Sequence, residues 1–229
     1  MGPRPPAPVR LMFIPLRDDN PTRRTPYVTA ALIAANVVVF ALGVLSTHGL
    51  ETNALRFGAV PYEITHLRSL NAALRPPPLL ALLTSLFVHG GLFHLLGNML
   101  YLWIFGNNVE DVLGAVRFTL FYFACGLAAG LTQVAVTPAS QVPMIGASGA
   151  IAGVLGAYWI LFPRARVDTL VLVFIVPVPA WLVLGLWFVL QVLNIGLGGG
   201  VAWSAHVGGF LAGVALILAA RRRRPPGRI

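Results

Sequence analysis

Charged residues and cysteine are scarce in this chain. Only 10% of its 229 residues are charged, it contains no lysine, and Cys125 is its single cysteine. One cysteine excludes an intrachain disulfide. The low charge, with a hydrophobic content of 57%, excludes a soluble domain of this size, because its interior is too small to hide so much apolar surface.

Long apolar stretches take the place of the missing charge. Stretches of roughly 18 or more apolar residues are typical of helices that cross a bilayer. The sequence therefore predicts an all-α polytopic membrane protein with six transmembrane helices. We expect these at about 27–45, 91–109, 113–135, 147–162, 169–194 and 202–220, the fifth helix being bent at Pro177 and Pro179.

Three further segments flank or connect these stretches. Residues 1–26, rich in proline and arginine, indicate a flexible cytoplasmic N-terminal tail, and residues 221–229 a basic cytoplasmic C-terminal tail. The first loop, at about 46–90, is the longest, and its short apolar run over 79–88 indicates partial association with the membrane. A single membrane domain over residues 27–220 lies between the tails.

The arginines predict the orientation of the protein. Both tails and the second and fourth connections hold 13 of the 16 arginines, whereas the long first loop holds only Arg56, Arg68 and Arg75. Basic residues accumulate on the cytoplasmic side of membrane proteins, so both termini are expected there. Because the arginines flank membrane spans, they predict contact with the lipid bilayer and no nucleic-acid partner.

Four polar side chains are expected at one depth near the outer surface. With this topology the second, fourth and sixth helices all run inward from the outside. His94 and Asn98 then lie in the first turns of the second helix, Ser148 in the first turn of the fourth, and His206 near the start of the sixth. His94 and Asn98 share one helix face because they are four residues apart.

This set of side chains suits nucleophilic catalysis. Small residues spaced four apart, Gly149 with Gly153 and Gly209 with Gly213, let helices approach closely. If the fourth and sixth helices cross there, Ser148 comes within hydrogen-bond reach of His206, as a nucleophile beside its base. The Ser148 N–H, His94 and Asn98 are candidate donors to an oxyanion.

A catalytic triad would also need a carboxylate. From residue 112 to the C-terminus the only acid is Asp168, which is expected at the cytoplasmic end, and nothing in the sequence brings Glu51 or Glu63 of the first loop to the site. A Ser148–His206 dyad is therefore the simpler assignment.

Each signal also has a structural interpretation. The stretch "GASGAIAG" alone is typical of plain helix packing, and an intramembrane histidine also suits a proton relay or a cation site. The remaining buried polar side chains are interpreted as interhelical hydrogen-bonding groups. These are Asn36, Thr132, Gln133, Gln191 and Asn194.

Three motifs together resemble the rhomboid family of intramembrane serine proteases. They are "HGGLFHLLGNMLYLWIFGNNVED" at 89–111, "GASGAIAG" at 146–153 and "AHVGGFLAG" at 205–213. The resemblance covers roughly residues 27–220 and is closest to the six-span bacterial form. It implies that Ser148 is the nucleophile, that His206 is the general base, and that His94, Asn98 and the Ser148 N–H bind the oxyanion.

The resemblance also implies what the protein acts on and where. The expected reaction is cleavage of transmembrane protein substrates near the outer face of a bacterial cytoplasmic membrane, with no metal and no cofactor. His89 and Glu110 match family positions interpreted as structural, and Ala152 replaces an aromatic residue that some members place beside the histidine. Trp181, Trp187 and Phe188 of the fifth helix are candidates for a lateral gate.

Two other classes of function stay open at this point. A small transporter would use His94, Asn98 and His206 to line a polar path. A non-catalytic membrane protein would bind and escort transmembrane helices, as inactive relatives are thought to do.

Overall fold

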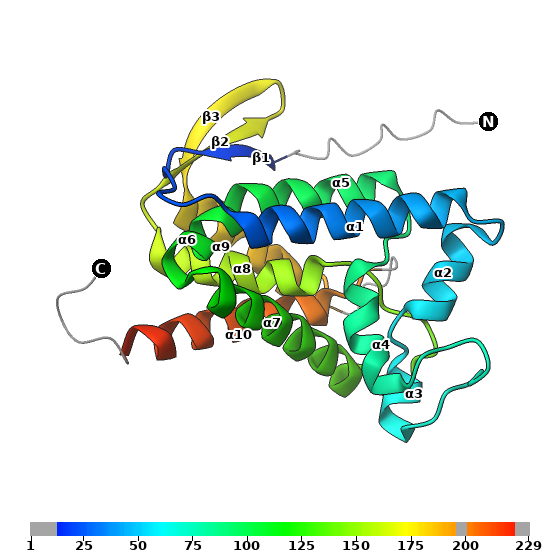
Figure 1. Cartoon of the computed structure of the whole chain (residues 1–229). Helices are drawn as coiled ribbons and strands as arrows, with labels where there is room; N and C mark the ends of the chain where they lie inside the picture. The colour runs from blue at the N-terminus through cyan, green and yellow to red at the C-terminus, as the bar shows by residue number, and fades with distance from the viewer. Residues whose placement is uncertain (1–12, 196–200, 223–229) are drawn as a thin grey trace, which may run out of the picture.

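The structure, a computed structural model, describes residues 13–195 and 201–222. Most of these residues are helical. The longer helices run roughly side by side, and the short helices of the first loop lie across one end of them (Figure 1). Residues 1–12 and 223–229 of the two predicted tails lie outside the described ranges. The principal helices are α1 (Tyr27–Leu45), α5 (Leu92–Tyr101), η2 (Leu102–Gly106), α6 (Asn107–Leu113), α7 (Ala115–Val136), α8 (Ser148–Leu161), α9 (Ala180–Leu193) and α10 (Trp203–Arg222).

Three of the described helices are long and apolar enough to cross a membrane, namely α1, α7 and α10. A fourth candidate is the pair formed by residues 78–87 and 92–113, which bends by 84° at the break between them. The helices α8 and α9 are apolar but only 14 residues long. Length and composition therefore support three or four spans, and the count of six stays a prediction.

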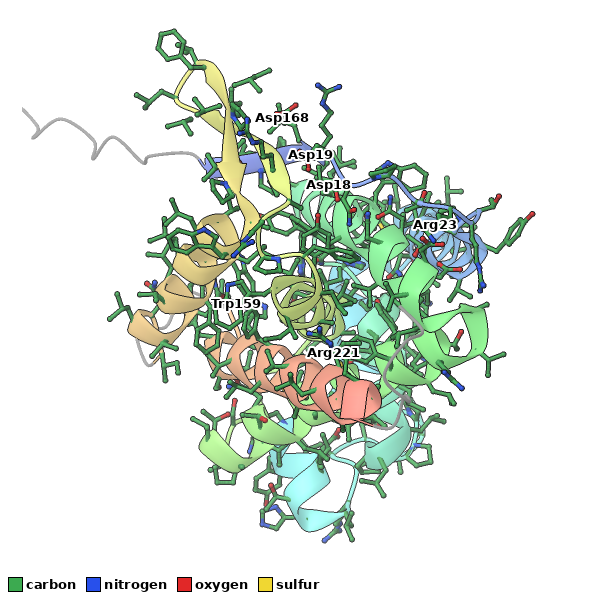
Figure 2. All side chains as sticks on the ribbon, turned by 90° about the vertical axis from the view of Figure 1, so that its left-hand side faces the viewer. Asp18, Asp19, Arg23, Trp159, Asp168 and Arg221 are labelled. Atoms are coloured by element: carbon green, nitrogen blue, oxygen red, sulfur yellow. The ribbon has the colours of Figure 1, made fainter. Side chains whose placement is uncertain are left out.

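The short helix α8 is the centre of the bundle. All residues from Gly149 to Tyr158 are buried, and the view along the bundle shows α8 surrounded by other helices (Figure 2). A helix that is apolar and buried all round needs no polar face, which explains why its sequence shows no amphipathic pattern. The first residue of this central helix is Ser148.

Glycine lets α8 and α10 pack backbone against backbone, as the small-residue pattern predicts. A Cβ atom added to Gly213 would lie 1.9 Å from the Gly153 carbonyl oxygen, and one added to Gly209 would lie 2.1 Å from the Gly149 oxygen. On another side of α8, a Cβ atom on Gly153 would lie 2.4 Å from Cys125, which is fully buried in α7. Any larger side chain at these positions would push the helices apart.

The prediction of a bent helix over 169–194 is wrong for its first part. Residues 166–179 form the strands β2 (Arg166–Val171) and β3 (Phe174–Pro179), and helix α9 begins only at Ala180. The β-branched residues of this stretch favour strands, and Leu172 adopts the left-handed conformation (φ 57°) that turns the chain between them. Pro177 and Pro179 therefore end a strand before a helix begins, since proline is tolerated on edge strands.

The expectations of an all-α fold and of a flexible tail over residues 1–26 both need correction. Residues Phe13–Asp18 form strand β1, which pairs antiparallel with β2 in a three-stranded sheet of order β1-β2-β3 (Figure 1). The Tyr158 hydroxyl of α8 and the Asn108 amide of α6 both donate to the Asp18 carboxylate. Burial raises the pKa of the Asp18 carboxyl, and the hydrogen bond from Tyr158 opposes that rise.

Glu110 connects α6 to the start of α1. Its carboxylate accepts hydrogen bonds from the backbone N–H groups of Val28 (2.9 Å) and Thr29 (2.7 Å) and from the Thr29 hydroxyl (2.7 Å). A carboxylate at a helix N-terminus satisfies unpaired donors and faces the positive end of the helix dipole. This contact supports the structural interpretation of Glu110.

The first loop has its own framework. It contains α2 (Gly49–Phe57), α3 (Pro61–His66), α4 (Pro78–Thr84) and η1 (Ser85–Phe87). Buried Glu63 pairs with the Arg75 guanidinium at 3.0 Å and also accepts the Leu70 backbone N–H at 2.7 Å. Glu63 is therefore engaged inside the loop.

Candidate active site

The chain approaches Ser148 through a constrained turn. Gly146 has φ +108°, a conformation that L side chains rarely adopt, and its N–H donates to the Ser85 carbonyl at 2.9 Å. Two residues earlier, Met144 exchanges backbone hydrogen bonds with Ala59 of the first loop. The turn is thus fastened on both sides, and α8 begins at Ser148 with its N–H lacking an acceptor inside the helix.

Ser148 and His206 are in hydrogen-bond contact. The Ser148 Oγ lies 2.8 Å from Nε2 of His206, which stands in the first turn of α10. The contact depends on the backbone packing of α8 on α10, because these helices carry the two side chains. The predicted proximity is confirmed, whereas the catalytic roles of the two residues stay predictions.

The other ring nitrogen of His206 also has a partner. Its Nδ1 lies 2.7 Å from Oε1 of Gln191, a buried residue of α9. The Trp187 ring of the same helix lies 5.9 Å from the His206 ring, centroid to centroid. The imidazole is thus held between α8 and α9.

His94 and Asn98 face the turn before Ser148. A Cβ atom added to Gly146 would lie 2.7 Å from His94 Nε2 and 3.5 Å from Asn98 Nδ2. The Asn98 amide nitrogen is buried without a hydrogen-bond partner among the described residues. A buried donor normally has a partner, so an amide left open beside the start of α8 suits an incoming acceptor.

These four residues line one open cavity. It has a volume of about 960 Å³, and its wall includes His94, Asn98, Ser148 and His206 together with Trp187. Gln133 and Ser140 add polar groups, whereas most of the remaining wall is apolar. Its volume is in the range of ligand-binding pockets, and Ser148 is part of its wall.

His89, which the sequence assigns a structural role, packs beside this site. It is 1% exposed, its ring lies 5.0 Å from that of His94, and neither of its nitrogens has a hydrogen-bond partner among the described residues. The interpretation of Gln133 and Gln191 as interhelical groups is confirmed, since Gln133 of α7 bonds to Ser204 and Ala205 of α10. Asn36 and Asn194 instead donate to carbonyls of their own helices.

The sequence predicts Gln191 as an interhelical hydrogen-bonding group but does not place it beside His206. The four predicted site residues lie on helices that are expected to enter from the outside, whereas α9 runs in the opposite direction. Its C-terminal end, where Gln191 lies, reaches the same level as His206. A search of both kinds of helix end for buried polar residues would find it.

Neither acid of the first loop reaches the serine. Glu63 is held by Arg75, and Glu51 lies exposed on α2. The described residues contain no group of three or more His, Cys, Asp or Glu side chains that could hold a metal ion.

Taken together, the fold and the cavity define a class of protein: a helical membrane protein with a serine and a histidine in contact inside its bundle. The Rhomboid domain family model matches residues 77–223. The chain belongs to the rhomboid family.

Similar proteins carry several descriptions. The chain is 35% identical over 146 residues to "Rhomboid protein 1, mitochondrial" of Saccharomyces cerevisiae, covering 59% of this chain and 40% of the yeast protein. It is 28% identical over 253 residues to "RHOMBOID-like protein 5" of Arabidopsis thaliana, covering 93% and 76% of the two chains. It is 32% identical over 200 residues to "Rhomboid protease GluP" of Bacillus subtilis, covering 83% and 35%. The matched region is less than half of the yeast and Bacillus proteins.

Proposed function

We propose that this protein is an intramembrane serine endopeptidase that cleaves transmembrane segments of other membrane proteins. The observation that carries the proposal is the 2.8 Å contact between Ser148 Oγ and His206 Nε2 at the wall of an open cavity. A hydroxyl beside an unprotonated imidazole nitrogen is an activated nucleophile. The match to a protein named a protease supports the same reaction class.

The reaction follows from the groups in the cavity. Ser148 Oγ attacks the substrate carbonyl while its proton passes to His206 Nε2. The oxyanion accepts hydrogen bonds from the Ser148 N–H, Asn98 Nδ2 and His94. His206 then gives the proton to the leaving amine, and the acyl ester remains on Ser148. A water molecule, deprotonated by His206, attacks this ester, and the acid product leaves as the proton returns to Ser148.

The length of α8 supports a site below the membrane surface. Its 14 residues span about 21 Å, whereas the hydrocarbon core is about 30 Å thick. If the end of α8 near the sheet lies at the cytoplasmic boundary, Ser148 lies roughly 10 Å beneath the outer boundary. The proposed arrangement has six membrane helices, both termini in the cytoplasm, and a cavity open to the extracytoplasmic side of a bacterial cytoplasmic membrane.

The substrate must present an extended chain to Ser148. Carbonyls in a helix are hydrogen-bonded and shielded, so the substrate helix has to unwind locally before attack. The protein is therefore expected to select transmembrane segments with helix-weakening residues near the outer surface. The family resemblance adds a small residue at the cleaved position.

Cleavage of a reporter transmembrane substrate in proteoliposomes tests this proposal. Ser148→Ala and His206→Ala are each expected to abolish cleavage while the protein still inserts. Ser46→Ala and His66→Ala are matched controls with expected wild-type rates, because among the described residues Ser46 hydrogen-bonds to the backbone of Gly43 and Gly49, and His66 contacts Tyr62. Undiminished cleavage by either site variant would remove the dyad, and substrate binding without cleavage by the wild type would favour the non-catalytic alternative.

A further inference from the structure

Two elements hold the His206 ring by its two nitrogens. Nε2 faces Ser148 of α8 at 2.8 Å, and Nδ1 faces the Gln191 side-chain oxygen of α9 at 2.7 Å. The Gln191 amide nitrogen donates in turn to the Trp187 backbone carbonyl at 3.1 Å. The four groups therefore form one chain of hydrogen bonds from the backbone of α9 to the serine.

The direction of this chain is fixed at its Trp187 end. A backbone carbonyl only accepts hydrogen bonds, so the Gln191 NH2 group must face it. The Gln191 oxygen is then the atom that faces His206, and an amide oxygen also only accepts. His206 must therefore carry its proton on Nδ1, whereas Nε2 keeps its lone pair toward the Ser148 hydroxyl.

This tautomer is the one that a general base needs. An imidazole that is protonated on Nε2 would offer the serine a proton in place of a lone pair. When His206 takes the serine proton during the reaction, its Nδ1–H becomes part of a cation, and the bond to Gln191 becomes charge-assisted. The contact is thus stronger in the transition state than in the resting enzyme.

No carboxylate competes for this role on the helices that surround His206. The sequences of α7, α8, α9 and α10 contain no Asp or Glu. The titratable group that faces His206 from α5 is His94, on another wall of the same cavity. A neutral amide therefore stands where a serine protease with a triad has its acid.

We infer that Gln191 is a positioning residue of the catalytic site, which fixes the tautomer and orientation of His206 from α9. The inference rests on the proposed function. It adds a third member to the predicted dyad, and it places that member on a different helix from the serine and the histidine.

The C-terminal half of α9 contacts the rest of the bundle through few residues. From Gly185 to Ile195, Gln191 is the one buried residue in this part of the described chain, although Trp187 and Phe188 are half-buried. The end of α9 nearest the site therefore contacts the bundle through the Gln191 bond and aromatic rings. Because the acceptor of the His206 Nδ1–H lies on α9, the orientation of the ring depends on how this helix is seated against α10.

Isosteric substitutions test the inference. Gln191→Met keeps the side-chain volume but lacks the oxygen acceptor, and we expect kcat for the reporter substrate to fall about 10- to 100-fold. KM is expected to change little, because Gln191 is not part of the cavity wall. Gln191→Glu restores an acceptor, and we expect a kcat above that of Gln191→Met and an acid limb of the pH–rate profile shifted to higher pH. A role in packing alone predicts the opposite order, because methionine fits an apolar site better than a charged group.

Asn194→Leu is the matched control. Asn194 is also an amide of this helix end and also donates to the carbonyl four residues earlier, at 2.6 Å, whereas the hydrogen bonds of the His206 ring among the described residues go to Gln191 and Ser148. Its substitution is expected to leave kcat unchanged. A wild-type kcat in Gln191→Met, or a lower kcat in Gln191→Glu than in Gln191→Met, would overturn the inference.

A measurement on the unaltered chain avoids any folding defect of the variants. Nitrogen-15 NMR of histidine-labelled protein in detergent distinguishes the two tautomers, and His206→Ala identifies the His206 signals by difference. The expected state is a protonated Nδ1 and an unprotonated Nε2, and the reverse would overturn the inference.

The proposed function and this inference fail separately. If the wild-type protein neither cleaves the substrate nor reacts with a serine-directed probe, the proposed function fails, whatever the tautomer. If the wild type is active and Gln191→Met equals it, only the role of Gln191 is lost.

Discussion

The helix α10 is packed against α8 on one side and α9 on another, and the two interfaces are built differently. Against α8, glycines bring backbone onto backbone, so that a single methyl group on Gly209 or Gly213 has no room. Against α9, the contact consists of aromatic rings, with Phe188 at 4.6 Å and Trp187 at 6.3 Å from the Phe210 ring, and of the Gln191–His206 bond.

This difference separates two tasks. Backbone contact leaves no interface side chains whose rotamers could adjust. It therefore fixes the separation of the α8 and α10 backbones, which carry Ser148 and His206. Side-chain contacts can be broken and remade at lower cost, and the orientation of the His206 ring depends on one of them, the bond to Gln191. The separation of the two helices is thus set by backbone packing, and the orientation of the ring by a side-chain contact.

The largest expected difference between the two interfaces appears when a glycine of each is replaced by alanine. Gly213→Ala adds a methyl group against the Gly153 carbonyl, and we expect about 3 kcal/mol lower stability and loss of cleavage. Gly185→Ala on α9 meets no atom closer than 4.0 Å and is expected to be neutral or about 0.5–1 kcal/mol more stable. Thermal unfolding in detergent and reporter cleavage measure both, and equal effects of the two substitutions would refute the distinction.

A second prediction concerns the wall of the cavity on α5. Asn98→Ala removes a donor aimed at the oxyanion, and kcat is expected to fall about 10²–10³-fold. Because the Asn98 Nδ2 has no partner among the described residues, stability is expected to stay near that of the wild type. Single-turnover kinetics combined with unfolding curves check both parts, and a drop in stability without a drop in kcat would assign Asn98 to packing.

The third prediction compares two tryptophans at opposite ends of α9. Trp187 lines the cavity and lies 5.9 Å from the His206 ring, whereas Trp181 is 51% exposed at the other end of the helix. Trp187→Ala is expected to change the cleavage rate about 2- to 10-fold, and Trp181→Ala to leave it unchanged. Equal effects of both would favour a lateral gate along the whole helix, as the sequence alone suggests, over a local contact with the histidine.

The smallest expected effect on activity lies at the far end of the bundle. Glu110→Gln weakens the capping of α1, and we expect about 1–2 kcal/mol lower stability with unchanged kcat. Chemical denaturation and reporter cleavage together test this separation. If a folded Glu110→Gln variant lost activity, the prediction that the capping of α1 affects stability alone would be wrong.

The sequence predicts those parts of the protein in which one apolar stretch or one residue spacing determines the structure. The first span, predicted at 27–45, coincides with α1, and the glycine spacing predicts the crossing of α8 and α10. The meeting of Ser148 with His206 follows from that crossing. For the crossing, the glycines that form the sequence pattern are the same residues that bring the two backbones into contact.

Local composition misleads where pairing between distant segments of the chain decides the structure. Residues 169–179 are apolar enough for a membrane helix, but they form the end of β2 and the whole of β3. Strand β2 pairs with β3 on one side and, on the other, with β1, whose partner residues Phe13, Ile14 and Pro15 lie more than 150 positions away and are not revealed by hydropathy. For Gln191 the sequence predicts an interhelical hydrogen bond but not its partner His206, because that partner is defined only when α9 and α10 are side by side. Neither error alters the predicted positions of Ser148, His206, His94 or Asn98.

Labelling with a fluorophosphonate probe tests the central claim most directly, since such probes react with a serine only when a base activates it. In native membranes we expect one modified residue, identified as Ser148 by mass spectrometry, with no labelling in Ser148→Ala and greatly reduced labelling in His206→Ala. A folded wild-type protein that stays unlabelled, or that is labelled equally well without Ser148, would contradict the account.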